Sequence, residues 1–178
     1  MPVIQETELR LERRFDPRPC RHFLNGEVYV LHCHHYATLY SQLADDCGML
    51  DGRKLLAEVA EDTFFDELGN YYDKHGVTDT ADRIALAEQY YAVTGLGQMH
   101  VRCAGPAGAE VELSHSHVDE GWIKKWGQRD KPVNFITQGY IAGALAAIFG
   151  RPRRSYVVVE TESLVKGDER SRFQAVSM

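Results

Sequence analysis

A sixteen-residue stretch near the C-terminal end most narrows what this chain can fold into. NFITQGYIAGALAAIF, residues 134–149, carries no charged side chain and predicts a helix that is closed by Gly150 and followed by Pro152. It is too short for a membrane span, which needs roughly 18 or more apolar residues. Gly139 and Gly143 lie four residues apart and let another backbone approach closely, so we expect this helix to pack tightly on a sheet.

The rest of the chain predicts helices and antiparallel hairpins in a mixed order. Helices are expected over 32–47, 52–72 and 80–93, a short amphipathic helix about 122–126, a strand over 26–31, and hairpins formed by 97–103 with 109–117 and by 154–161 with 171–176. The continuous apolar run of 154–161 predicts a central strand. This order indicates an α+β fold, an antiparallel sheet of two hairpins with helices packed on it. We expect an N-terminal strand or arm over residues 1–19 and a single domain over 20–178.

Composition excludes several classes of function. The chain has 20 basic and 26 acidic residues, a formal charge of −6, and therefore lacks the basic surface that a nucleic-acid-binding protein needs. No apolar run is long enough to predict a membrane span, and the first residues do not resemble a secretory signal. Four cysteines without a C-x-x-C pair fit a reducing cytoplasm better than a disulfide framework.

The last forty residues resemble the end of the 4-vinyl-reductase-like, hydrocarbon-binding domain. QGYIAGALAAIFGRPRRSYVVVETESLVKGDERSRFQAV matches that family's hairpin pattern at Glu160, Gly167, Asp168, Arg172 and Phe173. The resemblance implies the fold shared with subunits of a vesicle-tethering complex. It also implies a small hydrophobic or aromatic ligand and a homodimer.

The resemblance fails at the residues that hold a structural zinc in the sensor members of the family. Two cysteines and a glutamate belong to that site, but this chain has Ser163 and Ser171 where the cysteines would stand, and only Glu160 is kept. A neutral hydroxyl is a poor zinc ligand beside a thiolate. We therefore expect no zinc at these three residues.

Two histidine clusters, HCHH and SHSH, predict a possible metal site elsewhere. On the helix expected over 32–47, His32 and His35 fall on or beside an apolar stripe that we expect to face the core. That stripe consists of Tyr36, Leu39, Tyr40 and Leu43, with Thr38 and Ser41 opposite. On the second strand of the first hairpin, alternation places His115 and His117 on the core face with Val111 and Leu113.

These four imidazoles could bind iron or zinc, and Asp119 or Glu120 could complete a set of two histidines and one carboxylate. The same histidines could instead hydrogen-bond a polar ligand or be structural. Among the aromatic side chains, five could line a pocket for a flat apolar ligand or could be plain core: Tyr36, Tyr40, Phe64, Tyr90 and Trp122.

Two functions therefore stay open. The first is a domain that encloses a small hydrophobic or aromatic molecule between helices and sheet. The second is a metal-dependent enzyme of the non-haem iron or zinc type, with the metal on His32, His35, His115 and His117 and a small organic substrate.

Overall fold

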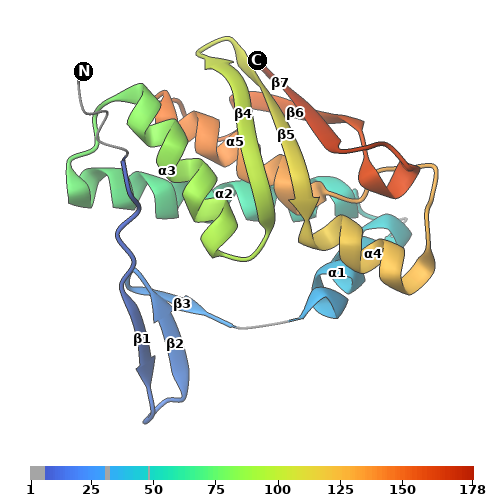
Figure 1. Cartoon of the computed structure of the whole chain (residues 1–178), viewed down its shortest axis with the longest axis horizontal. Coiled ribbons are helices and arrows are strands. Elements are labelled where there is room, and N and C mark those ends of the chain that lie inside the picture. The colour runs from blue at the N-terminus through green and yellow to red at the C-terminus, as the bar shows by residue number, and fades with distance from the viewer. Residues whose placement is uncertain (1–6, 31–32, 48) are drawn as a thin grey trace.

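A computed structural model describes residues 7–30, 33–47 and 49–178. Its main sheet has four antiparallel strands in the order β4-β5-β7-β6 (Figure 1). The strands are β4 (Gly97–Gly105), β5 (Gly108–Ser116), β6 (Tyr156–Glu162) and β7 (Ser171–Ser177). Both predicted hairpins are present, and the α+β class is confirmed. The prediction of a central strand at 154–161 is wrong, because β6 forms an edge and β7 lies inside the sheet. Val157 and Val159 on β6 are accordingly exposed.

Five α-helices accompany this sheet in the described part of the chain. They are α1 (His34–Asp46), α2 (Gly52–His75), α3 (Thr80–Val93), α4 (His117–Trp126) and α5 (Phe135–Ile148), and a short 3-10 turn, η1 (Leu164–Lys166), joins β6 to β7. Local signals explain several boundaries. The carboxylate of Asp79 accepts hydrogen bonds from the backbone N–H groups of Ala81 and Asp82 at the start of α3, and Gly76 ends α2 with φ of 64°.

Helix α5 is the centre of the core, packed between the sheet and α2 (Figure 1). Both glycines face α2 rather than the sheet, which corrects the expectation above. A Cβ built on Gly139 would lie 2.0 Å from the carbonyl oxygen of Ala57, and one on Gly143 would lie 2.6 Å from that of Glu61. The glycines therefore allow two helix backbones to touch. Across the described residues, no helix is both long and apolar enough to cross a bilayer.

The N-terminal arm is a separate three-stranded antiparallel sheet, which we define as residues 13–29. Its strands are β1 (Arg13–Asp16), β2 (Arg21–Leu24) and β3 (Glu27–Tyr29), and it projects from the body of the molecule (Figure 1). Asn25 and Gly26 join β2 to β3 with φ of 51° and 96°, which is the pattern of a type I′ hairpin turn. The arm thus extends past the boundary predicted at residue 19.

Helix α1 presents the opposite face to the one predicted. Its apolar stripe is exposed, with Tyr36 at 52% and Leu43 at 57%, whereas Thr38 and Ser41 are fully buried. The helix packs on α4 through a small second core that consists of Ala37, Val118, Trp122, Val133 and Val165. Periodicity located the stripe correctly, but it could not say on which side the rest of the chain would lie.

We predict that Gly139→Ala lowers the free energy of unfolding by roughly 2–4 kcal/mol, because the new methyl group forces α5 away from α2. The control is Gly69→Ala on α2, where nothing lies within 4 Å of the added Cβ. That change should be neutral or stabilise by up to about 1 kcal/mol. Urea titration followed by circular dichroism measures both, and equal effects of the two substitutions would contradict the close-approach argument.

Candidate ligand-binding groove

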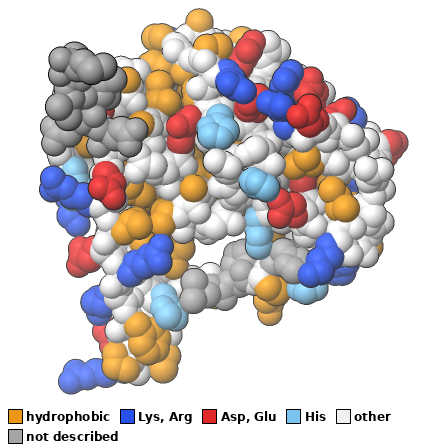
Figure 2. Space-filling view, in the orientation of Figure 1, with side chains coloured by type: hydrophobic (Ala, Val, Ile, Leu, Met, Phe, Trp, Pro, Cys, Tyr) orange, Lys and Arg blue, Asp and Glu red, His pale blue; other side chains and the backbone are white. Residues whose placement is uncertain are grey.

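A groove of about 660 Å³ lies between the arm and the body. Its lining is mostly apolar, with two arginines and two histidines: Arg13, Arg14, Phe15, His22, Phe23, Leu24, Tyr29, Val30, Val93, Thr94, Gly95, Leu96 and His117. Figure 2 shows the hollow between the projecting arm and the body. Volumes between about 300 and 1,000 Å³ are typical of small-molecule sites, so the groove is large enough for a small organic ligand.

The two walls come from distant parts of the sequence. On the arm, the rings of Phe15 and His22 pack with their centroids 4.8 Å apart. On the body, the segment from Val93 to Leu96 connects α3 to β4. His117 begins α4, and its backbone N–H donates to the carbonyl oxygen of Leu96 at 2.9 Å. This hydrogen bond joins the two parts of the body wall.

A buried hydrogen-bonded cluster joins the arm to the helices. The hydroxyl groups of Tyr29 on β3 and Tyr90 on α3 both donate to Oε2 of Glu67 on α2, at 2.6 and 3.0 Å. Burial raises the pKa of Glu67 above its usual range and, with the nearby Glu67 carboxylate, also raises the pKa of Tyr29. The tyrosine hydroxyls are therefore kept as donors, and the cluster sets the position of β3.

The segment that precedes the arm is also held by polar contacts. Leu9 N–H donates to Oε1 of Gln89 at 2.8 Å, and Nε2 of Gln89 donates to the carbonyl oxygen of Thr7 at 2.7 Å. Arg10 N–H donates to the Tyr71 hydroxyl at 2.8 Å. These bonds fix where the chain enters β1 and hence where the groove opens.

The predicted inward direction of His115 is wrong, and a β-bulge is the reason. Leu113 pairs with Met99 and His115 pairs with the adjacent Gln98, so Ser114 has no partner residue in the register. An extra residue in one strand reverses the alternation beyond it. The His115 side chain is consequently 71% exposed, with Nδ1 3.2 Å from Oε1 of Glu120.

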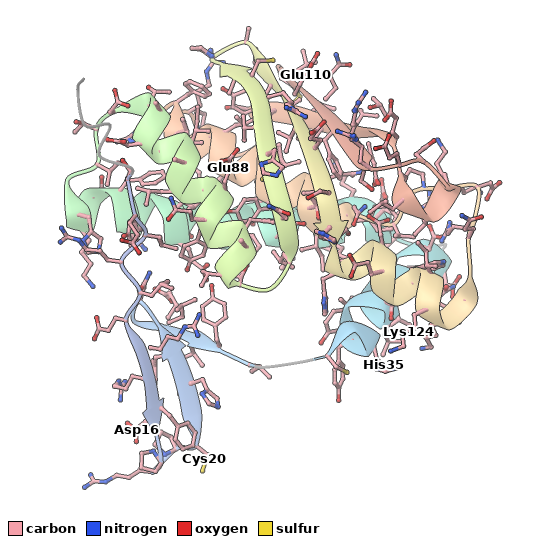
Figure 3. All side chains as sticks on the ribbon, in the orientation of Figure 1. Asp16, Cys20, His35, Glu88, Glu110 and Lys124 are labelled. Carbon is pink, nitrogen blue, oxygen red and sulfur yellow. The ribbon has the colours of Figure 1, made fainter. Side chains whose placement is uncertain are left out.

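Three of the four predicted metal ligands are described by the structure, namely His35, His115 and His117, and they do not form a metal site with one another. The strand ends at Ser116, so His117 lies at the start of α4 and lines the groove. His35 is exposed, with Nδ1 3.3 Å from Sγ of Cys33, and lies on the side of α1 away from the sheet (Figure 3). His32 lies outside the described residues. Within residues 7–30, 33–47 and 49–178, no group of three or more histidine, cysteine, aspartate or glutamate side chains could hold a metal ion. Binding of iron or zinc stays a prediction.

The five predicted ligand-binding aromatics lie in different parts of the fold. Tyr36 and Tyr40 are exposed on α1. Phe64 packs on Tyr140 with centroids 4.6 Å apart, and Tyr90 belongs to the Glu67 cluster. Trp122 is 5% exposed in the second core. The structure does not bring these five side chains together into one pocket.

The arm residues of the groove were missed by sequence reasoning, although one signal was available. Asn25-Gly26 stands between two β-prone runs, RHFL and EVYV, and Asn-Gly is the strongest short-range hairpin signal. A two-residue turn at Asn25-Gly26 predicts that Phe23 lies opposite Val28 and that Leu24 lies opposite Glu27, which is the observed pairing. No local pattern shows that this hairpin faces the loop at 93–96.

A second polar cluster occupies the place where the resemblance would put zinc. The side-chain amide of Asn134 donates to Asp119 Oδ2 at 2.7 Å and to Glu160 Oε1 at 2.8 Å. Ser171 Oγ donates to Asp119 Oδ2 at 2.9 Å. Oδ1 of Asp119, Oε2 of Glu160 and Oγ of Ser163 are buried, and none of the three has a hydrogen-bond partner among the residues that the structure describes.

This donor set does not fit zinc. It offers carboxylate, hydroxyl and amide groups but no thiolate or imidazole, and the donating amide nitrogen of Asn134 lies between the two carboxylates. Burial, with the neighbouring Asp119 carboxylate, raises the pKa of Glu160 to about 7, and burial raises the pKa of Asp119 as well. The raised pKa values favour protonated carboxyl groups, and hydrogen bonds hold the cluster together. The expectation of no zinc at this cluster stays a prediction.

Comparison with known proteins rests on structure. No family model matches the chain, and no curated protein matches it by sequence. The phenol-responsive sensory domain of the transcription activator PoxR, solved with phenol, superposes with a TM-score of 0.77 at 16% identity, over 93% of this chain and 84% of that one.

Two further structures have the same architecture. A vinyl-4-reductase family protein from Methanocaldococcus jannaschii has a TM-score of 0.51 at 14% identity, over 81% of this chain and 77% of its own. Subunit 3 of the trafficking protein particle complex from Naegleria fowleri, covalently bound to palmitic acid, has a TM-score of 0.54 at 12% identity, over 82% and 94%. The chain therefore has the α+β fold that these three proteins share.

The Glu160 cluster predicts a pH dependence of stability. A carboxyl group whose pKa is higher in the folded chain binds its proton more tightly there, so its contribution lowers stability as pH rises from 4.5 to about 7 and is constant above that. Glu160→Gln should remove this slope and raise the free energy of unfolding at pH 8 by about 2–3 kcal/mol. Unfolding titrations between pH 5 and pH 8 measure it.

The control for this experiment is Glu162→Gln on the same strand, where the side chain is 42% exposed and paired with Arg172. This variant should keep the slope of the parent protein. A Glu160→Gln protein with an unchanged slope would contradict the assignment.

Proposed function

We propose that the protein is a small-molecule-binding domain that takes an aromatic or other apolar molecule in the groove between the arm and the body. The observation that carries the proposal is the groove itself, about 660 Å³ in volume and lined on both walls by apolar side chains. The PoxR domain, which has the same fold, is phenol-responsive and was solved with phenol, and this supports the proposal. One fold hosts many functions, so the groove supports this function more directly than the fold does.

The chemistry of the two walls suits a flat ligand. Phe15, His22 and Tyr29 form an aromatic row on the arm, and Val93 and Leu96 supply aliphatic surface opposite. A ring between these walls gains apolar contact on both faces.

We also propose a cytoplasmic location for the protein. The free thiols of Cys20, Cys47 and Cys103 agree with a reducing cytoplasm.

Phe15→Ala should weaken binding of a small aromatic ligand about tenfold, because the ligand loses about half of the apolar contact area that a phenyl ring can provide. Val28→Ala is the matched control, since Val28 is 52% exposed and Phe15 51%, and their side chains lie on opposite faces of the arm. Titration calorimetry with phenol and 2-phenylethanol measures both. If neither compound binds at millimolar concentration, or if both variants behave alike, the groove is not the site.

We also propose that the protein is a homodimer joined through α1. The exposed stripe of Tyr36, Leu39, Tyr40 and Leu43 continues along the chain into further exposed apolar residues, Met49, Leu50, Leu55 and Val59. Each of these eight side chains is at least 39% exposed. Monomeric proteins rarely expose large apolar patches, and a second copy offers an equally apolar surface.

Leu43→Lys should convert a dimer into a monomer at tens of micromolar protein, because it places a charge in the apolar interface. Val159→Lys on β6 is the control, since Val159 is 54% exposed and Leu43 57%. Sedimentation velocity gives the oligomeric state. A parent protein that is monomeric, or a Leu43→Lys protein that stays dimeric, would rule out this surface.

A further inference from the structure

The register of the arm separates the groove side chains by the face on which they lie. Arg13 pairs with Leu24, Phe15 pairs with His22, and His22 pairs with Tyr29. Residues directly opposite one another in a sheet share a face, and residues two apart along a strand do too. These five side chains therefore form one surface, which is the surface that faces the body.

The opposite face of the arm has its own satisfied contacts. Arg14 lies over the ring of Phe23, with its guanidinium carbon 4.0 Å from the ring centroid. Its Nη1 also lies 3.1 Å from Oδ2 of Asp16. Arg14 also lines the groove, but its guanidinium is already engaged by Asp16 and by the ring of Phe23, so Arg13 is the lining arginine that no carboxylate of the described residues pairs with.

The groove is positive within an acidic protein. None of its thirteen lining residues is an aspartate or a glutamate, although the chain as a whole carries a formal charge of −6. Arg13 forms no ion pair with the described residues. Arginines elsewhere in the protein do pair with carboxylates, for example Arg129 with Asp45 and Arg154 with Glu61. An arginine that no carboxylate pairs with keeps its guanidinium available to a ligand.

The nearest acid on this face belongs to a different pocket. Glu27 lies beyond Leu24, two strand spacings or about 10 Å from Arg13. It lines a small separate cavity with Glu67 and Tyr90. Two imidazoles, those of His22 and His117, also line the groove. The His22 imidazole, which lies on the same face of the arm as Arg13, can donate an N–H.

From these placements we infer that the groove binds a small aromatic carboxylate. The ring lies between Phe15 and Leu24 on the arm and Leu96 on the body. The carboxylate accepts hydrogen bonds from the guanidinium of Arg13, whose planar fork matches the two oxygens of one carboxylate, and from an imidazole N–H. A single arginine that is not already paired suits a monoanion better than a doubly charged phosphate. This inference rests on the proposed function and narrows its ligand class.

The test compares phenylacetate with 2-phenylethanol, which have nearly the same shape but differ in charge. At an ionic strength of about 0.01 M, where charges act over about 30 Å, phenylacetate should bind the full chain about five- to tenfold more tightly. The preference should vanish in Arg13→Gln, while binding of 2-phenylethanol is kept. It should also shrink at about 1 M salt.

Arg21→Gln is the matched control, because it removes the same charge from the same arm. Arg21 pairs with Asp16 on the opposite face and does not line the groove. The Arg21→Gln protein should prefer phenylacetate over 2-phenylethanol by the same factor as the parent protein. Equal binding of the two compounds, or equal losses in Arg13→Gln and Arg21→Gln, would overturn the carboxylate inference and leave the aromatic site in place. If neither compound binds, the proposed function itself fails.

Discussion

The contact between α5 and α2 is the constraint on which the rest of the structure depends. Gly139 and Gly143 bring the two helix backbones together, so α5 can be covered by α2 on one side and by the four-stranded sheet on the other. Once α5 is enclosed, α2 is fixed in place. Glu67, carried by α2, then holds Tyr29 of the arm. The groove is therefore a consequence of core packing, although none of the core glycines is near it.

The parts of the fold that could be predicted from the sequence are those with a local cause. Asp79 caps α3, Gly76 ends α2, and both hairpins of the main sheet follow from their turns and apolar runs. The resemblance at residues 138–176 led to the correct fold. It also located the buried cluster at Glu160, which the hydrogen bonds of Asn134 and Asp119 then complete.

The parts that could not be predicted depend on partners distant in sequence. The bulge at Ser114 turns His115 outward, and it is visible only in the pairing of β5 with β4. The stripe on α1 is real but faces solvent, because Ala37, Thr38 and Ser41 meet the core instead. The groove joins residues about eighty positions apart, from the arm and from the 93–96 segment. For such features amphipathic patterns give the shape of an element but not its neighbours.

The attachment of the arm has a consequence for selectivity. The body wall of the groove packs on the main core, whereas the arm wall is tied to it by the burial of Leu9 and by a few side-chain hydrogen bonds, chiefly those of Tyr29, Gln89 and Tyr71. A wall held in this way can shift at small cost when molecules of different thickness enter. The protein should then tolerate variation in ring substituents while staying strict about the polar end of the ligand, because that end must reach Arg13, and the strand register sets the face of the arm on which Arg13 lies.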